Sequence, residues 1–118
     1  MLKEFWDVVQ AVGTWPGAAI TRDRRGLCLR LNTVTLGHLD WDGRLVLPFA
    51  PLMRDEIVAG RMATRDPEQA DTGYATFEVR TAKDVDRALS LLRFAYLTAD
   101  AKHDLCASVA AQEPVTQA

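Results

Sequence analysis

Residues 36–49 read LGHLDWDGRLVLPF, and this stretch decides the fold. The Asp-Gly pair at 42–43 is a strong signal for a β-hairpin turn, because glycine readily adopts a positive φ. The residues on either side of the pair are mostly apolar, as they are in strands with a buried face. The stretch therefore predicts two antiparallel strands joined by a tight turn. We expect Leu36 and His38 to share one face of the first strand and Leu39 to lie on the other.

Alternating apolar residues also predict strands on both sides of this hairpin. Residues 18–23 and 27–31 extend the meander toward the N-terminus, and residues 74–80 form a later strand. Between the hairpin and that later strand, segment 61–73 is polar and contains a proline, so we expect a loop that is either mobile or functional.

Helical spacing of apolar residues predicts three helices, at residues 2–12, at 52–59 and after Thr81, the last with an apolar stripe that runs from Val85 to Ala99. The second helix is expected to end at Gly60, in the left-handed position that follows many helices. Thr81 should cap the third helix, with Asp84 completing a capping box. The order of helix, strands, helix, strand, helix predicts an α+β fold. We expect a two-layer sandwich whose mostly antiparallel meander sheet has about five strands, with the helices packed on one face.

The length and charge of the chain restrict its class. A chain of 118 residues fits one domain, which we expect to span residues 1–100, followed by a partly disordered C-terminal extension at 101–118.

The net charge of −2 disfavours nucleic-acid binding, which usually requires a basic face. No apolar run approaches the roughly 20 residues that cross a bilayer, so we expect no membrane association. Acidic residues within the first seven positions argue against a signal peptide, and we expect a cytoplasmic protein.

His38 and Asp40 are the candidate catalytic residues. They are two positions apart on a predicted strand, so their side chains project from the same face. An aspartate can orient an imidazole and raise its basicity, which would make His38 a general acid or base. The alternative is an exposed ion pair at the end of a hairpin. We expect no metal, because Asp42 should hydrogen-bond the backbone of the turn, and no cofactor, because no glycine-rich nucleotide motif is present.

Trp41, Tyr74 and Arg54 are the candidate ligand-binding residues. Trp41 lies in a polar turn and is expected to be exposed. An exposed indole offers apolar surface that a ligand or a protein partner can bind. A cleft between the sheet and segment 61–73 is the expected site for a small molecule. Trp41 and the apolar stripe of the last helix also offer a surface on which two copies could pair as a homodimer.

Three stretches carry a family resemblance. The run at 36–49, RDEIVAGRMA at 54–63 and TGYATFEVRTAKDVDRALSLLRFAYL at 72–97 resemble small bacterial luciferase-domain proteins, and so does Trp15-Pro16-Gly17. The resemblance spans roughly residues 15–97 and implies a compact α+β domain of undefined biochemistry.

The family pattern tends to have a second histidine at the position of Asp40 and another within residues 64–71. This chain has neither, so of a histidine-based site only His38 would remain.

Two hypotheses follow. The first is a luciferase-domain-like protein that binds a small molecule in the cleft. The second is a cofactor-independent enzyme that uses His38 and Asp40. A nucleic-acid-binding module is disfavoured by the charge.

Overall fold

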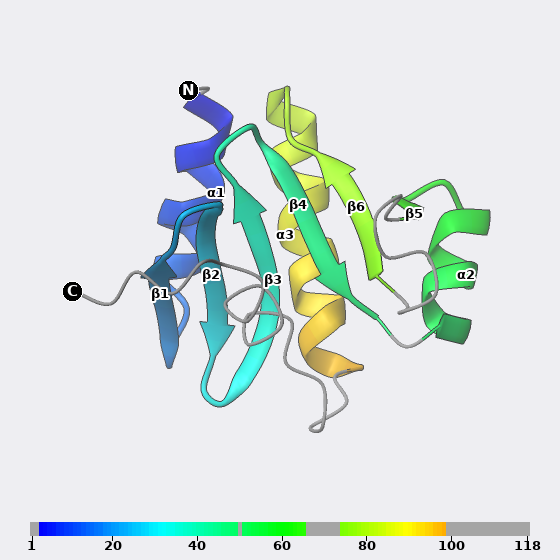
Figure 1. The fold of residues 1–118 in the computed structure, drawn as a ribbon, viewed down its shortest axis with the longest axis horizontal. Coiled ribbons are helices and arrows are strands. Elements are labelled where there is room, and N and C mark those ends of the chain that lie inside the picture. The colour runs from blue at the N-terminus through cyan, green and yellow to red at the C-terminus, as the bar shows by residue number, and fades with distance from the viewer. Residues whose placement is uncertain (1–2, 50, 66–73, 99–118) are drawn as a thin grey trace.

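The computed structural model describes residues 3–49, 51–65 and 74–98, which form three helices and a six-stranded antiparallel sheet. The sheet is open, with the strand order β1-β2-β3-β4-β6-β5 (Figure 1). Helices α1 and α3 lie on one of its faces, which confirms the predicted α+β arrangement. The elements are α1 (Lys3–Gly13), β1 (Ala18–Arg22), β2 (Gly26–Leu31), β3 (Val34–Asp40), β4 (Arg44–Pro48), α2 (Pro51–Ala59), β5 (Thr64–Arg65), β6 (Tyr74–Glu78) and α3 (Ala82–Leu97).

The predicted hairpin is formed by β3 and β4, with the turn where the Asp-Gly signal places it. Gly43 has a φ of 93°, and its N–H donates to Asp40 O at 2.9 Å. The carboxylate of Asp42 accepts the N–H of Arg44 at 3.0 Å, which is the backbone-bonding role predicted for it. A residue with a Cβ would be strained at this φ, so glycine fixes the turn and the register of the two strands.

A β-bulge changes which side chains of β3 reach the core. The pairing with β2 shifts between Leu29 and Arg30, so that Leu29 pairs with Gly37 and Arg30 with Thr35. Leu36 and Leu39 both join the core beneath the helices and are fully buried. The prediction that Leu36 shares a face with His38 is therefore wrong, because the extra residue of a bulge breaks the alternation of the strand.

The helix ends follow local sequence signals with one exception. Thr81 caps α3 as predicted, since its hydroxyl accepts the N–H of Asp84 and the Asp84 carboxylate accepts the N–H of Thr81. At the end of α2 the left-handed residue is Arg61, with a φ of 59°, and not Gly60. The N–H groups of Arg61 and Met62 bond back to α2 in the pattern of a Schellman motif.

The predicted loop at 61–73 is interrupted by a short strand. Thr64 and Arg65 form β5, which pairs with Thr76 and Ala75 of β6 and makes β5 an edge of the sheet. Helix α2 lies beside these two strands (Figure 1). The remainder of this segment, residues 66–73, and the predicted extension at 101–118 lie outside the described residues. None of the described helices has the length and apolar character needed to cross a membrane.

Candidate functional site

His38 lies between two carboxylates. Its Nδ1–H donates to Asp40 Oδ1 at 2.6 Å, and its Nε2–H donates to Asp23 Oδ2 at 2.8 Å. The His38 side chain is 1% exposed, so the predicted pair is buried and not an exposed ion pair at a hairpin end. We call Asp23, His38 and Asp40 the His38 cluster.

The turn between β1 and β2 positions Asp23. Its Oδ1 accepts the N–H groups of Arg25 and Gly26 at 2.8 and 2.9 Å, while its own N–H donates to Gly26 O. These bonds fix the carboxylate so that the other oxygen reaches His38. The sequence alone did not identify Asp23 as a site residue. The run DRRG at residues 23–26 predicts only a solvent-exposed hairpin turn. The Asp-x-x-Gly spacing predicts the turn but not a partner 15 residues away.

Two carboxylates determine the protonation state of His38. Burial lowers the pKa of His38, but hydrogen bonds to Asp40 and Asp23, together with their negative charges, raise it above the ordinary value of 6.5. Only an imidazolium has two N–H donors, so this arrangement fits the charged ring. A ring protonated on both nitrogens has no lone pair with which to accept a proton. The geometry therefore does not present His38 as a general base, and the catalytic role of His38 and Asp40 stays a prediction.

A second cation lies beside the His38 cluster. Arg25 approaches Asp40, with 3.7 Å between a guanidinium nitrogen and Oδ2. His38 and Arg25 thus both place positive charge beside Asp40. The carboxylates bind opposite nitrogens of the ring and do not converge on one point. Within residues 3–49, 51–65 and 74–98, no three His, Cys, Asp or Glu side chains are arranged as metal ligands.

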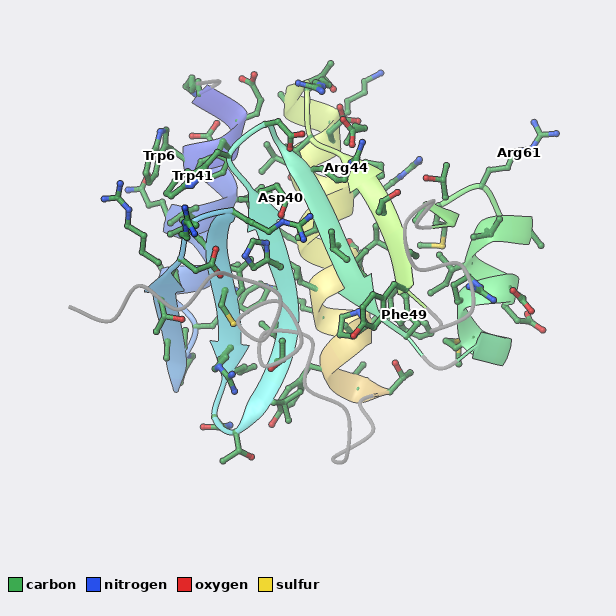
Figure 2. All side chains as sticks on the ribbon, in the orientation of Figure 1. Trp6, Asp40, Trp41, Arg44, Phe49 and Arg61 are labelled. Atoms are coloured by element: carbon green, nitrogen blue, oxygen red, sulfur yellow. The ribbon has the colours of Figure 1, made fainter. Side chains whose placement is uncertain are left out.

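Trp41 is half-buried and not exposed as predicted, because α1 and the β1–β2 turn cover its ring. Phe5 stacks on the indole with 5.7 Å between ring centroids, and the Arg22 guanidinium lies 5.3 Å over it. The indole N–H donates to Arg24 O at 3.2 Å. Figure 2 shows Trp41 near Trp6 of α1, far across the sheet from Arg61.

The structure does not bring the three predicted ligand-binding residues together. Tyr74 begins β6, opposite Pro48 at the far end of β4 from Trp41, and is 1% exposed. Arg54 lies on α2, 3% exposed, with its Nε–H donating to Asp55 at 2.8 Å. Trp41 therefore cannot share one pocket with Tyr74 and Arg54, and ligand binding at each of them stays a prediction.

A pocket of about 400 Å³ opens where the end of α2 meets β5 and β6. It lies in the region where the cleft between the sheet and segment 61–73 is predicted, and a ligand-binding role for it stays a prediction. The apolar part of its described lining is Val58, Met62, Ala63 and Phe77, and the polar part is Arg61, Thr64, Thr76 and Glu78. We call this hollow the β5–β6 pocket. Its volume falls within the range of about 300–1,000 Å³ that is typical of ligand pockets.

Two hydroxyls lie side by side in the β5–β6 pocket. Thr64 Oγ1 and Thr76 Oγ1 are 2.9 Å apart, and Thr64 also donates to Thr76 O at 3.2 Å. The Glu78 carboxylate is neutralised by Arg44 at 3.2 Å and Arg80 at 2.8 Å. Arg61 also lines the pocket, and Figure 2 shows its side chain projecting away from the sheet.

The comparisons with known proteins identify one family. Searches of the curated proteins and of the solved structures found no significant match. A model of the Luciferase domain family matches residues 35–95, more than half of the 118 residues. The match runs from β3 to the last turns of α3 and includes His38, Asp40 and the strands that line the β5–β6 pocket. The chain therefore belongs to the Luciferase domain family.

Proposed function

We propose that this chain binds a small, largely apolar molecule in the β5–β6 pocket. The observation that carries the proposal is the combination of a ligand-sized hollow, an apolar wall and a pair of hydroxyls at one point of that wall. Ligand sites typically pair apolar surface, which supplies affinity, with a few polar groups, which fix orientation.

The chemistry of the lining defines the class of ligand. The carboxylate of Glu78 is already paired with Arg44 and Arg80, so it is not left to attract a cationic ligand. An uncharged ligand with one hydrogen-bonding group is therefore favoured over a cationic one. That group would bond to Thr64 and Thr76 while its apolar body contacts Val58 and Phe77.

The Schellman motif at the end of α2 forms one edge of this pocket. A left-handed conformation costs roughly 1–2 kcal/mol for a residue with a Cβ, and glycine avoids that cost. Gly60 precedes Arg61, yet Arg61 is the residue that adopts a φ of 59°. The two hydrogen bonds of the motif hold this conformation, so that edge of the pocket is formed before a ligand binds.

Fragment screening by NMR tests the proposal. A library of uncharged fragments is titrated into ¹⁵N-labelled full-length protein, and hits should move the amide signals of residues 61–64 and 76–78. Thr64→Val removes the hydroxyl while keeping the shape of the side chain, and it should weaken those hits several-fold. Thr21→Val makes the same change in β1 at the opposite edge of the sheet and should leave them unchanged.

Two results would overturn the proposal. One is the absence of any fragment that moves the pocket amides. The other is an equal loss of affinity in Thr64→Val and Thr21→Val, which would show that the hydroxyl at the pocket has no special role.

A further inference from the structure

A second pocket lies at the C-terminal end of α3, away from β5 and β6. It has a volume of about 340 Å³, and its described lining is Trp15, Pro16, Leu31, Arg93, Tyr96 and Leu97. We call it the Trp15 pocket. Leu97 is 79% exposed at its rim, so apolar surface remains for a bound molecule to cover.

A rigid turn forms one wall of the Trp15 pocket. The N–H of Ala18 donates to Trp15 O at 3.0 Å, with Pro16 and Gly17 between them and Gly17 at a φ of 82°. This is the geometry of a type II turn, in which proline and glycine occupy the positions that suit them. The N–H of Asn32 donates to Gly17 O at 2.9 Å and ties the turn to the β2–β3 hairpin. The wall is therefore formed before any ligand arrives.

Arg93 supplies the one charge of the described lining. Its guanidinium carbon lies 4.9 Å from the centroid of the Trp15 ring. None of the ion pairs found among residues 3–49, 51–65 and 74–98 involves Arg93, and no acidic residue lies three or four positions from it on α3. Stacking on an indole engages the face of a guanidinium and leaves its in-plane N–H donors available. Those donors match the two oxygens of a carboxylate.

We propose that the Trp15 pocket binds a small aromatic monocarboxylate. The carboxylate pairs with the N–H edge of Arg93, and the aromatic body lies against Trp15, Tyr96 and Leu97. One cation balances one negative charge, so a monoanion fits this lining better than a phosphate dianion does. This site shares no lining residue with the β5–β6 pocket, and its ligand differs in charge.

A titration with 4-phenylbutyrate tests the proposal, with neutral 4-phenylbutyramide as the matched ligand. In ¹⁵N-labelled full-length protein, the carboxylate should move the indole signal of Trp15 and the Nε signal of Arg93. The indole signals of Trp6 and Trp41, which lie outside this pocket, serve as internal controls and should stay in place. The amide should bind at least about tenfold more weakly, because it lacks the charge that Arg93 recognises.

Two variants separate the charge from the stacking contact. Arg93→Gln should weaken binding of the carboxylate about tenfold and leave binding of the amide unchanged. Arg87→Gln is the control, because Arg87 is also on α3 and lies 6.0 Å over the ring of Phe77, outside the Trp15 pocket. It should not change either affinity. Equal binding of the two ligands, equal losses in the two variants, or shifts shared by all three indoles would overturn the proposal.

Discussion

The His38 cluster is closed and the β5–β6 pocket is open, although strands of one sheet build both. In the cluster, each nitrogen of His38 bonds to its own carboxylate, and the ring is 1% exposed. In the pocket, four apolar residues, two threonines, Arg61 and Glu78 surround about 400 Å³ of space. Reactive side chains can thus satisfy one another as a structural network, whereas a ligand requires space. The residues with the richest chemistry are therefore not the ones that we propose to bind the ligand.

The largest predicted effect tests whether the His38 cluster is structural. His38→Ala removes the cation and leaves Asp23 and Asp40 facing each other without it. We expect the free energy of unfolding in urea to fall by about 3 kcal/mol, as when one partner of a buried ion pair is removed. Leu97→Ala, at a residue that is 79% exposed, is the control and should change it by less than about 0.5 kcal/mol.

A triple variant sharpens this test. His38→Leu combined with Asp23→Asn and Asp40→Asn removes all three charges, and it should recover most of the lost stability. If His38→Ala unfolds at the same urea concentration as the parent chain, the cluster is not a structural ion network.

A smaller effect is the dependence of stability on pH. The pKa of His38 is raised in the folded protein, so the folded state holds this proton more tightly than the unfolded state. The stabilisation is fully present below the unfolded value of 6.5 and is lost as the pH rises through the higher folded value. Urea unfolding should therefore show decreasing stability on the alkaline side of 6.5. A His38→Gln variant should lose that part of the slope, and an unchanged slope would contradict the assignment.

The substitution Arg61→Gly tests the left-handed backbone at the edge of the β5–β6 pocket. Glycine adopts a φ of 59° without the steric cost of a Cβ, so this variant should gain about 0.5–1 kcal/mol in the free energy of unfolding. Arg61→Ala keeps a Cβ and removes the charge, so it should gain almost nothing. An equal gain in both variants would show that the charge and not the backbone is responsible.

The smallest expected effect on stability belongs to Thr64→Val. Thr64 is an exposed residue of a two-residue edge strand, so its replacement should change the free energy of unfolding by less than about 0.5 kcal/mol. The same variant should weaken ligands of the β5–β6 pocket, which separates binding from folding. A large loss of stability would instead make Thr64 a structural residue like those of the His38 cluster.

Several features could be predicted because neighbouring residues determine them. The Asp-Gly turn at 42–43 and the Thr81 capping box follow from the preferences of a few adjacent residues. The contact between His38 and Asp40 follows from two-residue spacing on a strand. The α+β class follows from the order of helices and strands, because each must bury an apolar face against another layer.

Other features depended on how distant segments meet. Asp23 reaches His38 only because β1, β2 and β3 pair side by side, and no pattern within the DRRG turn signals that contact. The bulge in β3 that sends Leu36 into the core comes from register against β2. Trp41 is half-buried because α1 folds back and places Phe5 against its indole.

By itself, the sequence determined the local elements, the fold class and the pairing of His38 with Asp40. The tertiary structure decided how those elements combine. It placed His38 between two carboxylates, and it left one pocket beside Thr64 and another beside Arg93. The physical reason is that turns, caps and strand alternation arise from short-range sterics and hydrogen bonds. The burial of a side chain, the protonation of His38 and the position of a pocket depend on which residues, distant in the sequence, come into contact in the folded protein.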